Sequence, residues 1–242
     1  MSTPRLYVEA ALAEGQDAPA LPGQGHYLGQ VMRKREGDAV LLFNGRDGEW
    51  QARVAAIRKD RVVFIPERQT RPQATGPDLR LLVAPIKRDA MDWIVEKATE
   101  LGVRMIQPVF TARSVVGRVN LDRLTLIARE AAEQCERLDL PEIAAPLDLH
   151  RALDQWDGAP LLVGDARGNA PPLSVVLAGR RPPIGLLVGP EGGFTEPELD
   201  AVRRRPFVSP AALGPRILRA ETAAVSGLAV LQALAGDWAA PS

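Results

Sequence analysis

The sequence predicts an α/β protein with a smaller β-rich domain before it. From residue 79 onward, short apolar strands alternate with amphipathic helices. This alternation is typical of a mostly parallel sheet with helices on both faces, because each parallel crossover needs a connecting helix. Before residue 72, short strands follow one another closely, which favours a small barrel or sandwich. Residues 66–78 are rich in Pro, Gly and polar side chains and read as a linker, so we expect domains at 1–72 and 78–242.

Composition narrows the class of protein. The chain has 242 residues, 46% of them hydrophobic, which is enough for a sizeable core, and no apolar run reaches the roughly 20 residues of a membrane helix. One cysteine and two histidines exclude a disulfide framework and disfavour a metal site, so no metal is expected. The start lacks the pattern of a signal peptide, so we expect a cytoplasmic protein. A formal net charge of zero allows a local basic patch but not a basic protein overall.

In the N-terminal part, apolar runs and turn signals define the expected elements. Asn44-Gly45 is a hairpin turn signal, and Gly37-Asp38 marks another turn. We expect strands at residues 5–8, 39–43, 50–57 and 61–65, and a helix at residues 26–33.

The C-terminal part has clearer helix boundaries. Asp89 suits an N-cap, Gly102 a helix stop, and Thr195 with Glu198 has capping-box spacing. Cys135 lies on an apolar helical face, which favours a core residue over a nucleophile. We expect strands at 79–85, 103–110, 161–164, 184–188 and 207–213, and helices at 89–101, 121–137, after Thr195 and at 220–235.

Two glycine-containing turns follow two of these strands. The first is GPEGGF at 189–194 and the second lies in LGPRILRAETA at 213–223. Turns at the carboxyl ends of neighbouring parallel strands form a ligand-binding crevice, and glycines let the backbone approach the ligand. The glycine spacing fits neither a Walker loop nor a Rossmann fingerprint. An ordinary strand-to-helix turn remains the alternative interpretation.

The two turns resemble the signature pair of the SPOUT-class RNA methyltransferases, and more closely that of the ribosomal RNA small subunit methyltransferase E family. Further similarity lies in KATELGV (97–103), Arg113-Ser114, residues 130–137 and Leu140-Pro141, with shorter matches before residue 46. The resemblance implies an S-adenosylmethionine-dependent enzyme that methylates N3 of one uridine in 16S ribosomal RNA. It also implies a trefoil knot in the C-terminal domain, a PUA-like RNA-binding barrel before it, and a homodimer acting on the small subunit.

The resemblance places the cofactor on three loops, at the ends of three strands. Backbone groups there would bind the adenine and the methionine end, and apolar side chains would pack on the ring. The expected residues are Leu162, Val163, Gly164, Asp165, Gly189, Pro190, Glu191, Gly192, Gly193, Leu213, Gly214, Ile217 and Leu218.

The chemistry is assigned to Arg219, Glu221 and Thr222. Methyl transfer to a ring nitrogen needs alignment of the reactants, stabilisation of negative charge and removal of a proton. An arginine can supply the charge and a carboxylate can take the proton. Alternatively, Glu221 is a first-turn residue favoured by the helix dipole, and Arg219 forms a structural ion pair.

Basic residues supply the candidate RNA contacts, since each neutralised phosphate adds affinity. A solvated charged surface is the alternative, because acidic residues are interspersed. The candidates are Arg5, Arg33, Lys34, Arg35, Lys87, Arg88 and Arg216.

Two other functions compete with this interpretation. One is another SPOUT methyltransferase, acting on transfer RNA or on a ribose oxygen, and only the modified nucleoside distinguishes it. The other is a noncatalytic RNA-binding module, which would not bind the cofactor tightly. A phosphate-binding hydrolase is disfavoured, because no Walker lysine follows the first turn and no histidine is near either turn.

Overall fold

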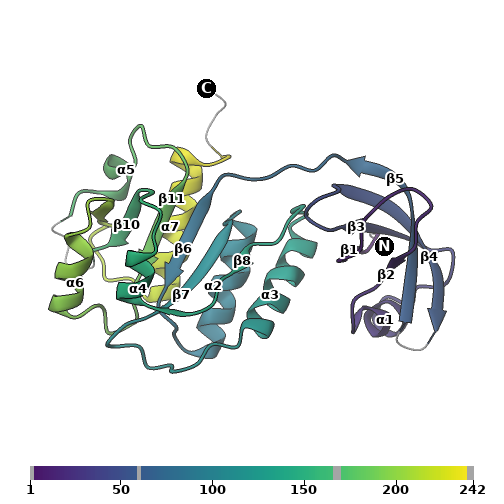
Figure 1. Ribbon diagram of the computed structural model, residues 1–242, viewed down its shortest axis with the longest axis horizontal. Helices are drawn as coiled ribbons and strands as arrows, with labels where there is room; N and C mark the ends of the chain where they lie inside the picture. Colours follow the sequence, from purple (N-terminus) through teal and green to yellow (C-terminus); the bar gives the residue numbers. More distant parts are fainter. Residues whose placement is uncertain (1–2, 59–60, 166–169, 239–242) are drawn as a thin grey trace. The chain divides into compact units, whose positions relative to one another are not determined.

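The computed structural model describes residues 3–58, 61–165 and 170–238 (Figure 1). The chain divides into two compact units. The first unit comprises Met1–Thr75 together with Ala132–Leu140, and the second comprises Gly76–Ala131 and Pro141–Ser242. The domain division expected at 1–72 and 78–242 stays a prediction; it places residues 132–140 in the second domain, whereas in the structure they cluster with the first unit.

The first unit contains a five-stranded sheet in the order β1-β3-β4-β5-β2. Its neighbours pair antiparallel except β1 with β3, which are parallel. Leu6, Leu42 and Phe64 are among the fully buried residues of its core. The elements are β1 (Arg5–Tyr7), β2 (Ala18–Pro19), α1 (Gln24–His26), the π-helical η1 (Tyr27–Val31), β3 (Ala39–Phe43), β4 (Glu49–Arg58) and β5 (Arg61–Arg71).

The linker expected at 66–78 is wrong in its first half, because β5 continues through Pro66 to Arg71. Pro66 lies opposite Ala52, next to a register shift between β4 and β5. Proline has no N–H for the ladder, and such an irregularity is where a strand accommodates it. The helix expected at 26–33 begins and ends two residues earlier, because α1 and η1 together cover residues 24–31 and Arg33 adopts a φ of 52°.

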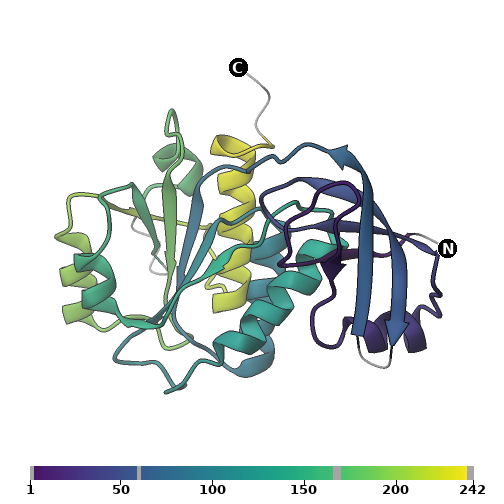
Figure 2. The ribbon, with the colours of Figure 1, turned by 45° about the vertical axis from the view of Figure 1, so that its right-hand side comes forward.

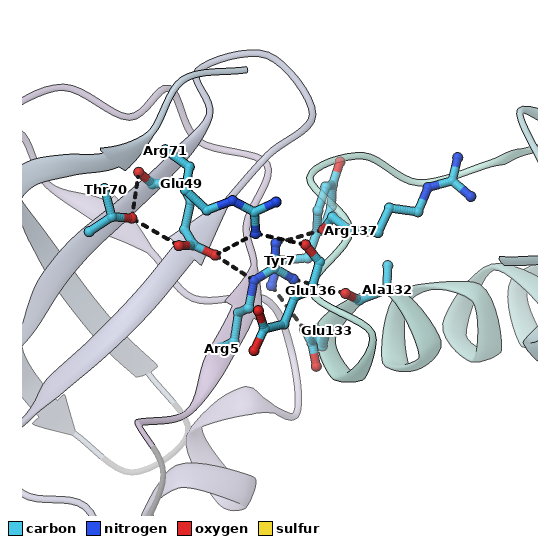
Figure 3. A network of polar contacts seen from close by, with 9 residues as sticks. All are labelled: Arg5, Tyr7, Glu49, Thr70, Arg71, Ala132, Glu133, Glu136 and Arg137. Atoms are coloured by element: carbon cyan, nitrogen blue, oxygen red, sulfur yellow. Dashed lines mark hydrogen bonds and ion pairs between the residues drawn. The ribbon is translucent and has the colours of Figure 1, made fainter. Parts of the chain in front are cut away.

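A buried arginine organises the polar interior of the first unit (Figure 3). The Arg5 Nε donates to Glu49 Oε2 at 2.7 Å, and the two side chains are 6% and 7% exposed. The other guanidinium nitrogens of Arg5 donate to the carbonyls of Ala132 at 2.8 Å and Arg137 at 2.6 Å. Its guanidinium carbon lies 3.8 Å from the centre of the Phe43 ring. Arg5 thus ties strand β1 to the segment 132–140.

Apolar contacts reinforce this attachment. Ala132 and Leu138 are buried in a cluster with Phe43, and Tyr7 packs against them. The Tyr7 N–H also donates to the Glu133 carboxylate at 2.9 Å (Figure 3). The segment 132–140 belongs to the first unit because Arg5 bonds two of its carbonyls and because its apolar side chains pack against Phe43 and Tyr7.

The second unit is built on a parallel sheet in the order β12-β10-β11-β6-β7-β8, with β9 pairing β7. Its neighbouring strands pair parallel to one another throughout the described residues, which confirms the expected α/β architecture. The strands are β6 (Leu79–Val83), β7 (Met105–Phe110), β8 (Glu142–Ile143), β9 (Leu147–Asp148), β10 (Leu161–Gly164), β11 (Ile184–Val188) and β12 (Val208–Ala211).

Helices cover both faces of this sheet, because successive strand residues point to opposite sides. In β11, Leu186 packs in one core with α2, α3, α5 and α7, whereas Leu187 packs in the other with α4 and α6. Figure 2 shows α7, in yellow, beside the strands. The helices are α2 (Arg88–Glu100), α3 (Leu121–Gln134), α4 (Leu149–Asp154), α5 (Leu173–Val176), α6 (Glu196–Arg203) and α7 (Ala220–Ala235). The knot stays a prediction.

Helix boundaries follow local signals with two exceptions. Asp89 is not the N-cap of α2: Lys87 holds that position, and Asp89 lies in the first turn. The helix expected at 121–137 ends at Gln134, and Glu136 has a φ of 62°, which a continuing right-handed helix does not allow. Cys135, just beyond the helix end, is half-buried. Within the described residues, no helix is both long and apolar enough to span a bilayer.

We expect Arg5→Met to lower the free energy of unfolding by about 3 kcal/mol, because it leaves the buried Glu49 carboxylate without its partner. Urea denaturation followed by circular dichroism measures the change. Arg68→Met is the matched control, since Arg68 is exposed and its side chain bonds the Gln51 side chain at the surface. Equal losses in the two variants would show that the Arg5 network contributes no special stability.

Candidate functional site

A pocket lies in the second unit, at the carboxyl ends of β10, β11 and β12. These strands are neighbours in the sheet, so the loops that follow them meet at one edge. The pocket has an empty volume of about 730 Å³, part of which is open to solvent. Its lining residues are Gly164, Asp165, Val188, Gly189, Pro190, Glu191, Gly193, Phe194, Leu213, Gly214, Arg216, Ile217, Leu218, Ala220 and Ala223.

Glycines leave bare backbone along this lining. Gly193 and Gly214 have φ values of 66° and 109°, which side-chain-bearing residues rarely adopt. A Cβ atom built on Gly164, Gly193 or Gly214 would meet no heavy atom within 4 Å. Because these positions border open space, a ligand can approach their main chain directly.

The turn after β11 is closed and tightly packed. The Gly193 N–H donates to the Pro190 carbonyl at 2.8 Å. A Cβ on Gly189 would lie 2.9 Å from the Phe194 ring, which is buried under the turn. Glycine at 189 is therefore a packing requirement, whereas glycine at 193 is a conformational one.

The pocket combines an apolar side with a few charged groups. Leu213, Ile217 and Leu218 contribute apolar surface, and the Ile217 residue is 84% exposed. Asp165, whose side chain is 9% exposed, lies 4.0 Å from Arg203 between the nearest charged atoms. Such a lining suits a ligand with a flat apolar ring and several polar groups.

Ten of the thirteen residues expected at the cofactor site line this pocket. The exceptions are Leu162, Val163 and Gly192. Leu162 and Val163 are buried within β10, on opposite faces of the sheet, where their side chains belong to the two cores. Gly192 is exposed in the turn and faces Arg113 rather than the pocket. Sequence reasoning missed Val188, Phe194, Ala220 and Ala223 as lining residues; Val188 and Phe194 flank the glycine turn, which was the available signal.

The residues expected to carry the chemistry lie beside the pocket, at the start of α7. Arg219 is the N-cap residue of α7, and its side chain is 85% exposed. Its Nη1 is 3.9 Å from Glu221 Oε1, a loose and exposed ion pair. Thr222 is exposed, and its carbonyl accepts a hydrogen bond from the Ser226 hydroxyl at 2.6 Å. None of these three residues is among those that line the described pocket, although their neighbours are.

The expected RNA contacts divide between the two units. Lys87 and Arg88, at the start of α2, are exposed at the carboxyl edge of the sheet, as is Arg216 in the pocket lining. In the first unit, Arg33 and Arg35 are exposed after η1, and Lys34 between them is half-buried. Arg5 is not available to RNA, because its guanidinium is buried against Phe43 and bonded to Glu49 and to two carbonyls.

Glu198, in the first turn of α6, connects two loops at this edge of the sheet. Its Oε1 accepts from the Ala112 N–H at 2.6 Å, and its Oε2 accepts from the Thr195 N–H at 2.8 Å and hydroxyl at 2.9 Å. Burial alone would raise the pKa of Glu198, but the N–H donors of Ala112 and Thr195 outweigh it and hold the pKa below 4.5. The capping box was expected from the sequence; the bond to Ala112 was not.

No group of three or more His, Cys, Asp or Glu side chains that could hold a metal occurs within residues 3–58, 61–165 and 170–238.

Comparisons with known proteins give a consistent result. Residues 74–232 match the family model of an RNA methyltransferase domain, and residues 22–67 match an RNA methyltransferase PUA domain. Ribosomal RNA small subunit methyltransferase E of Rickettsia conorii is 33% identical over 95% of both chains. The Bacillus subtilis protein of the same name is 29% identical, over 94% of this chain and 95% of the relative.

Solved structures agree with the sequence comparisons. The crystal structure of ribosomal RNA small subunit methyltransferase E from Neisseria gonorrhoeae, bound to S-adenosyl methionine, has a TM-score of 0.86 and 30% identity. The match covers 98% of this chain and 100% of the other.

The depressed pKa of Glu198 makes stability depend on pH. The ionised carboxylate stabilises the fold fully above about pH 5, and this contribution is lost as the pH falls through the lower pKa of the folded state. We therefore expect the unfolding free energy of the wild type to fall more steeply between about pH 5 and pH 3 than that of Glu198→Gln. Denaturation curves across this range measure the difference, and parallel curves would contradict the assigned role.

Proposed function

Because the chain belongs to the ribosomal RNA small subunit methyltransferase E family, we propose that it transfers the methyl group of S-adenosylmethionine to N3 of a uridine in 16S ribosomal RNA. The observation that carries the proposal is the pocket at the ends of β10, β11 and β12, whose lining includes residues of all three loops on which the family resemblance places the cofactor. The small-subunit name of the relatives and the cofactor bound in the Neisseria structure support the substrate and the cofactor.

The residues of the pocket fit S-adenosylmethionine. Leu213, Ile217 and Leu218 offer apolar surface to the adenine, and the open backbone at Gly164 and Gly214 offers polar groups to its edges. Asp165 can accept hydrogen bonds from hydroxyl or ammonium groups. When bound, the cofactor supplies an activated methyl group on a positively charged sulfur.

The reaction is a direct displacement that this chain promotes by positioning. N3 of uridine forms a bond to the methyl carbon, the carbon–sulfur bond breaks, and its electron pair stays on sulfur. The N3 proton leaves, and the negative charge that develops is shared with the two flanking carbonyl oxygens. Residues at the mouth of the pocket must therefore accept a proton and stabilise an anion.

Arg219 and Glu221 are suited to these two tasks. The Arg219 guanidinium is free to turn toward a base at the pocket mouth, because its side chain is exposed and its contact with Glu221 is loose. Glu221 lies in the first turn of α7 and its side chain is partly shielded, so its carboxylate can take the proton while Arg219 faces the anion. We assign Thr222, the next residue of α7, to a contact with the substrate.

Binding of the RNA involves both units. Lys87, Arg88 and Arg216 supply phosphate contacts next to the pocket, and Arg33 to Arg35 supply them on the first unit, which matches a PUA domain. Arg5 is left out of this surface because it is buried. The substrate is the small subunit in the cytoplasm.

Labelled S-adenosylmethionine and 30S subunits that lack the modification test the proposal, with the labelled nucleoside identified by mass spectrometry. We expect label in N3-methyluridine. Label in a ribose or in another base would indicate another SPOUT methyltransferase activity. Label only in transfer RNA would show that the ribosomal subunit is not the substrate. Absence of both label and cofactor binding would leave a noncatalytic RNA-binding module.

The same assay separates the roles at α7. We expect Arg219→Ala and Glu221→Gln each to lower kcat by roughly 100-fold with little change in cofactor Kd, because both act on charge that develops in the transition state. Isothermal titration gives the Kd. A Glu221→Gln variant with full kcat would leave Glu221 as a helix-start residue favoured by the macrodipole.

The protein is further proposed to act as a homodimer, as the family resemblance implies. Exposed apolar side chains of the second unit, Leu234 and Trp238, are available to a second copy. Analytical ultracentrifugation at micromolar concentration is expected to give twice the chain mass of 26.1 kDa. A single monomeric species would contradict this.

A further inference from the structure

The loop that follows β7 lies against the turn that lines the pocket. Arg113 extends from this loop, and its Nη1 donates to the Gly192 carbonyl at 2.7 Å and approaches the Phe194 carbonyl at 3.5 Å. The side chain also covers Gly192, since a Cβ there would lie 3.5 Å from Arg113 Cδ. One guanidinium nitrogen thus bridges the two carbonyls that flank Gly193.

The loop that carries Arg113 is itself fixed. The Ala112 N–H donates to the buried Glu198 carboxylate. The same carboxylate accepts from the N–H of Thr195, which follows the turn of residues 189–194. Thr111 and Ser114 bond each other on the other side of Arg113, through the Thr111 N–H at 3.0 Å and between their hydroxyls at 3.1 Å. Arg113 therefore projects from a rigid base onto the turn.

The two carbonyls that Arg113 holds are those that set the shape of the turn. Gly193, between them, has the left-handed φ of 66° and lines the pocket. Phe194 lines the pocket too, and its ring leaves no room for a side chain at Gly189. A change in the orientation of either carbonyl would rotate the Gly193 peptide or move the Phe194 ring, and the lining would change.

We infer that Arg113 is a positioning residue that holds the turn of residues 189–194 in its ligand-binding shape. This inference rests on the proposed function, because the ligand is taken to be S-adenosylmethionine. An arginine is suited to the task because its charged N–H groups form strong bonds to carbonyl oxygens, at a fixed angle set by the planar guanidinium. Arg113 acts from outside the pocket, of which it is not a lining residue in the described chain.

The test compares Arg113→Ala and Arg113→Lys with the wild type in full-length protein. For Arg113→Ala, we expect cofactor Kd and the KM for S-adenosylmethionine to rise by roughly threefold to tenfold, with kcat at saturating cofactor nearly unchanged. Arg113→Lys is expected to restore part of the affinity, since it keeps the charge and loses the planar guanidinium. Isothermal titration and initial rates on 30S subunits measure these quantities.

Arg205→Ala is the matched control. Arg205 also bonds across elements, to Asp154, but it precedes β12 and so lies at the amino end of that strand, away from the pocket. We expect it to leave cofactor Kd unchanged. Equal Kd values for the wild type and Arg113→Ala would overturn the inference, as would an Arg113→Ala variant whose only defect is a raised KM for RNA.

The inference and the proposed function fail differently. If the wild type binds no S-adenosylmethionine, the proposed function fails, and the inference fails with it. If the wild type binds and methylates while Arg113→Ala differs only in melting temperature, the function stands and Arg113 is merely structural.

Discussion

The second unit depends on burial of both faces of one parallel sheet. Strands such as β11 (Ile184–Val188), buried at every residue, have their backbone paired on both sides and their side chains in two separate cores. Polar chemistry cannot be placed inside such a sheet without a large desolvation cost. It is therefore confined to the edge, where β10, β11 and β12 end together and their loops enclose the pocket.

At that edge, function depends on main chain more than on side chains. Gly193 and Gly214 adopt positive φ values that other residues rarely adopt. Because glycine leaves the backbone flexible, contacts from neighbouring residues must hold such a turn in one conformation. The support comes from a neighbouring loop: Glu198 fixes that loop and the end of the turn, and Arg113 fixes the turn's carbonyls. A carboxylate and a guanidinium thus replace the rigidity that glycine lacks.

In the first unit, a buried ion pair is stabilised by several hydrogen bonds. Arg5 and Glu49 are both almost fully enclosed, which is tolerable only because each is bonded several times. Two of these bonds reach carbonyls at the end of α3 and beyond it, so strand β1 and the segment 132–140 belong to one compact unit. An arginine that looked like an RNA contact in the sequence is instead part of the interior.

The sequence by itself determined the fold class, most element boundaries and the two glycine turns beside the candidate site, because periodicity, caps and glycine turns are local signals. It did not determine that β5 passes through Pro66, since the tolerance of proline depends on a register shift in the partner strand. Only the tertiary structure decided that Arg5 is buried, that Leu162 and Val163 lie in the cores and that Arg113 reaches the turn of residues 189–194. These facts depend on contacts between residues tens of positions apart, and no pattern within one segment encodes them.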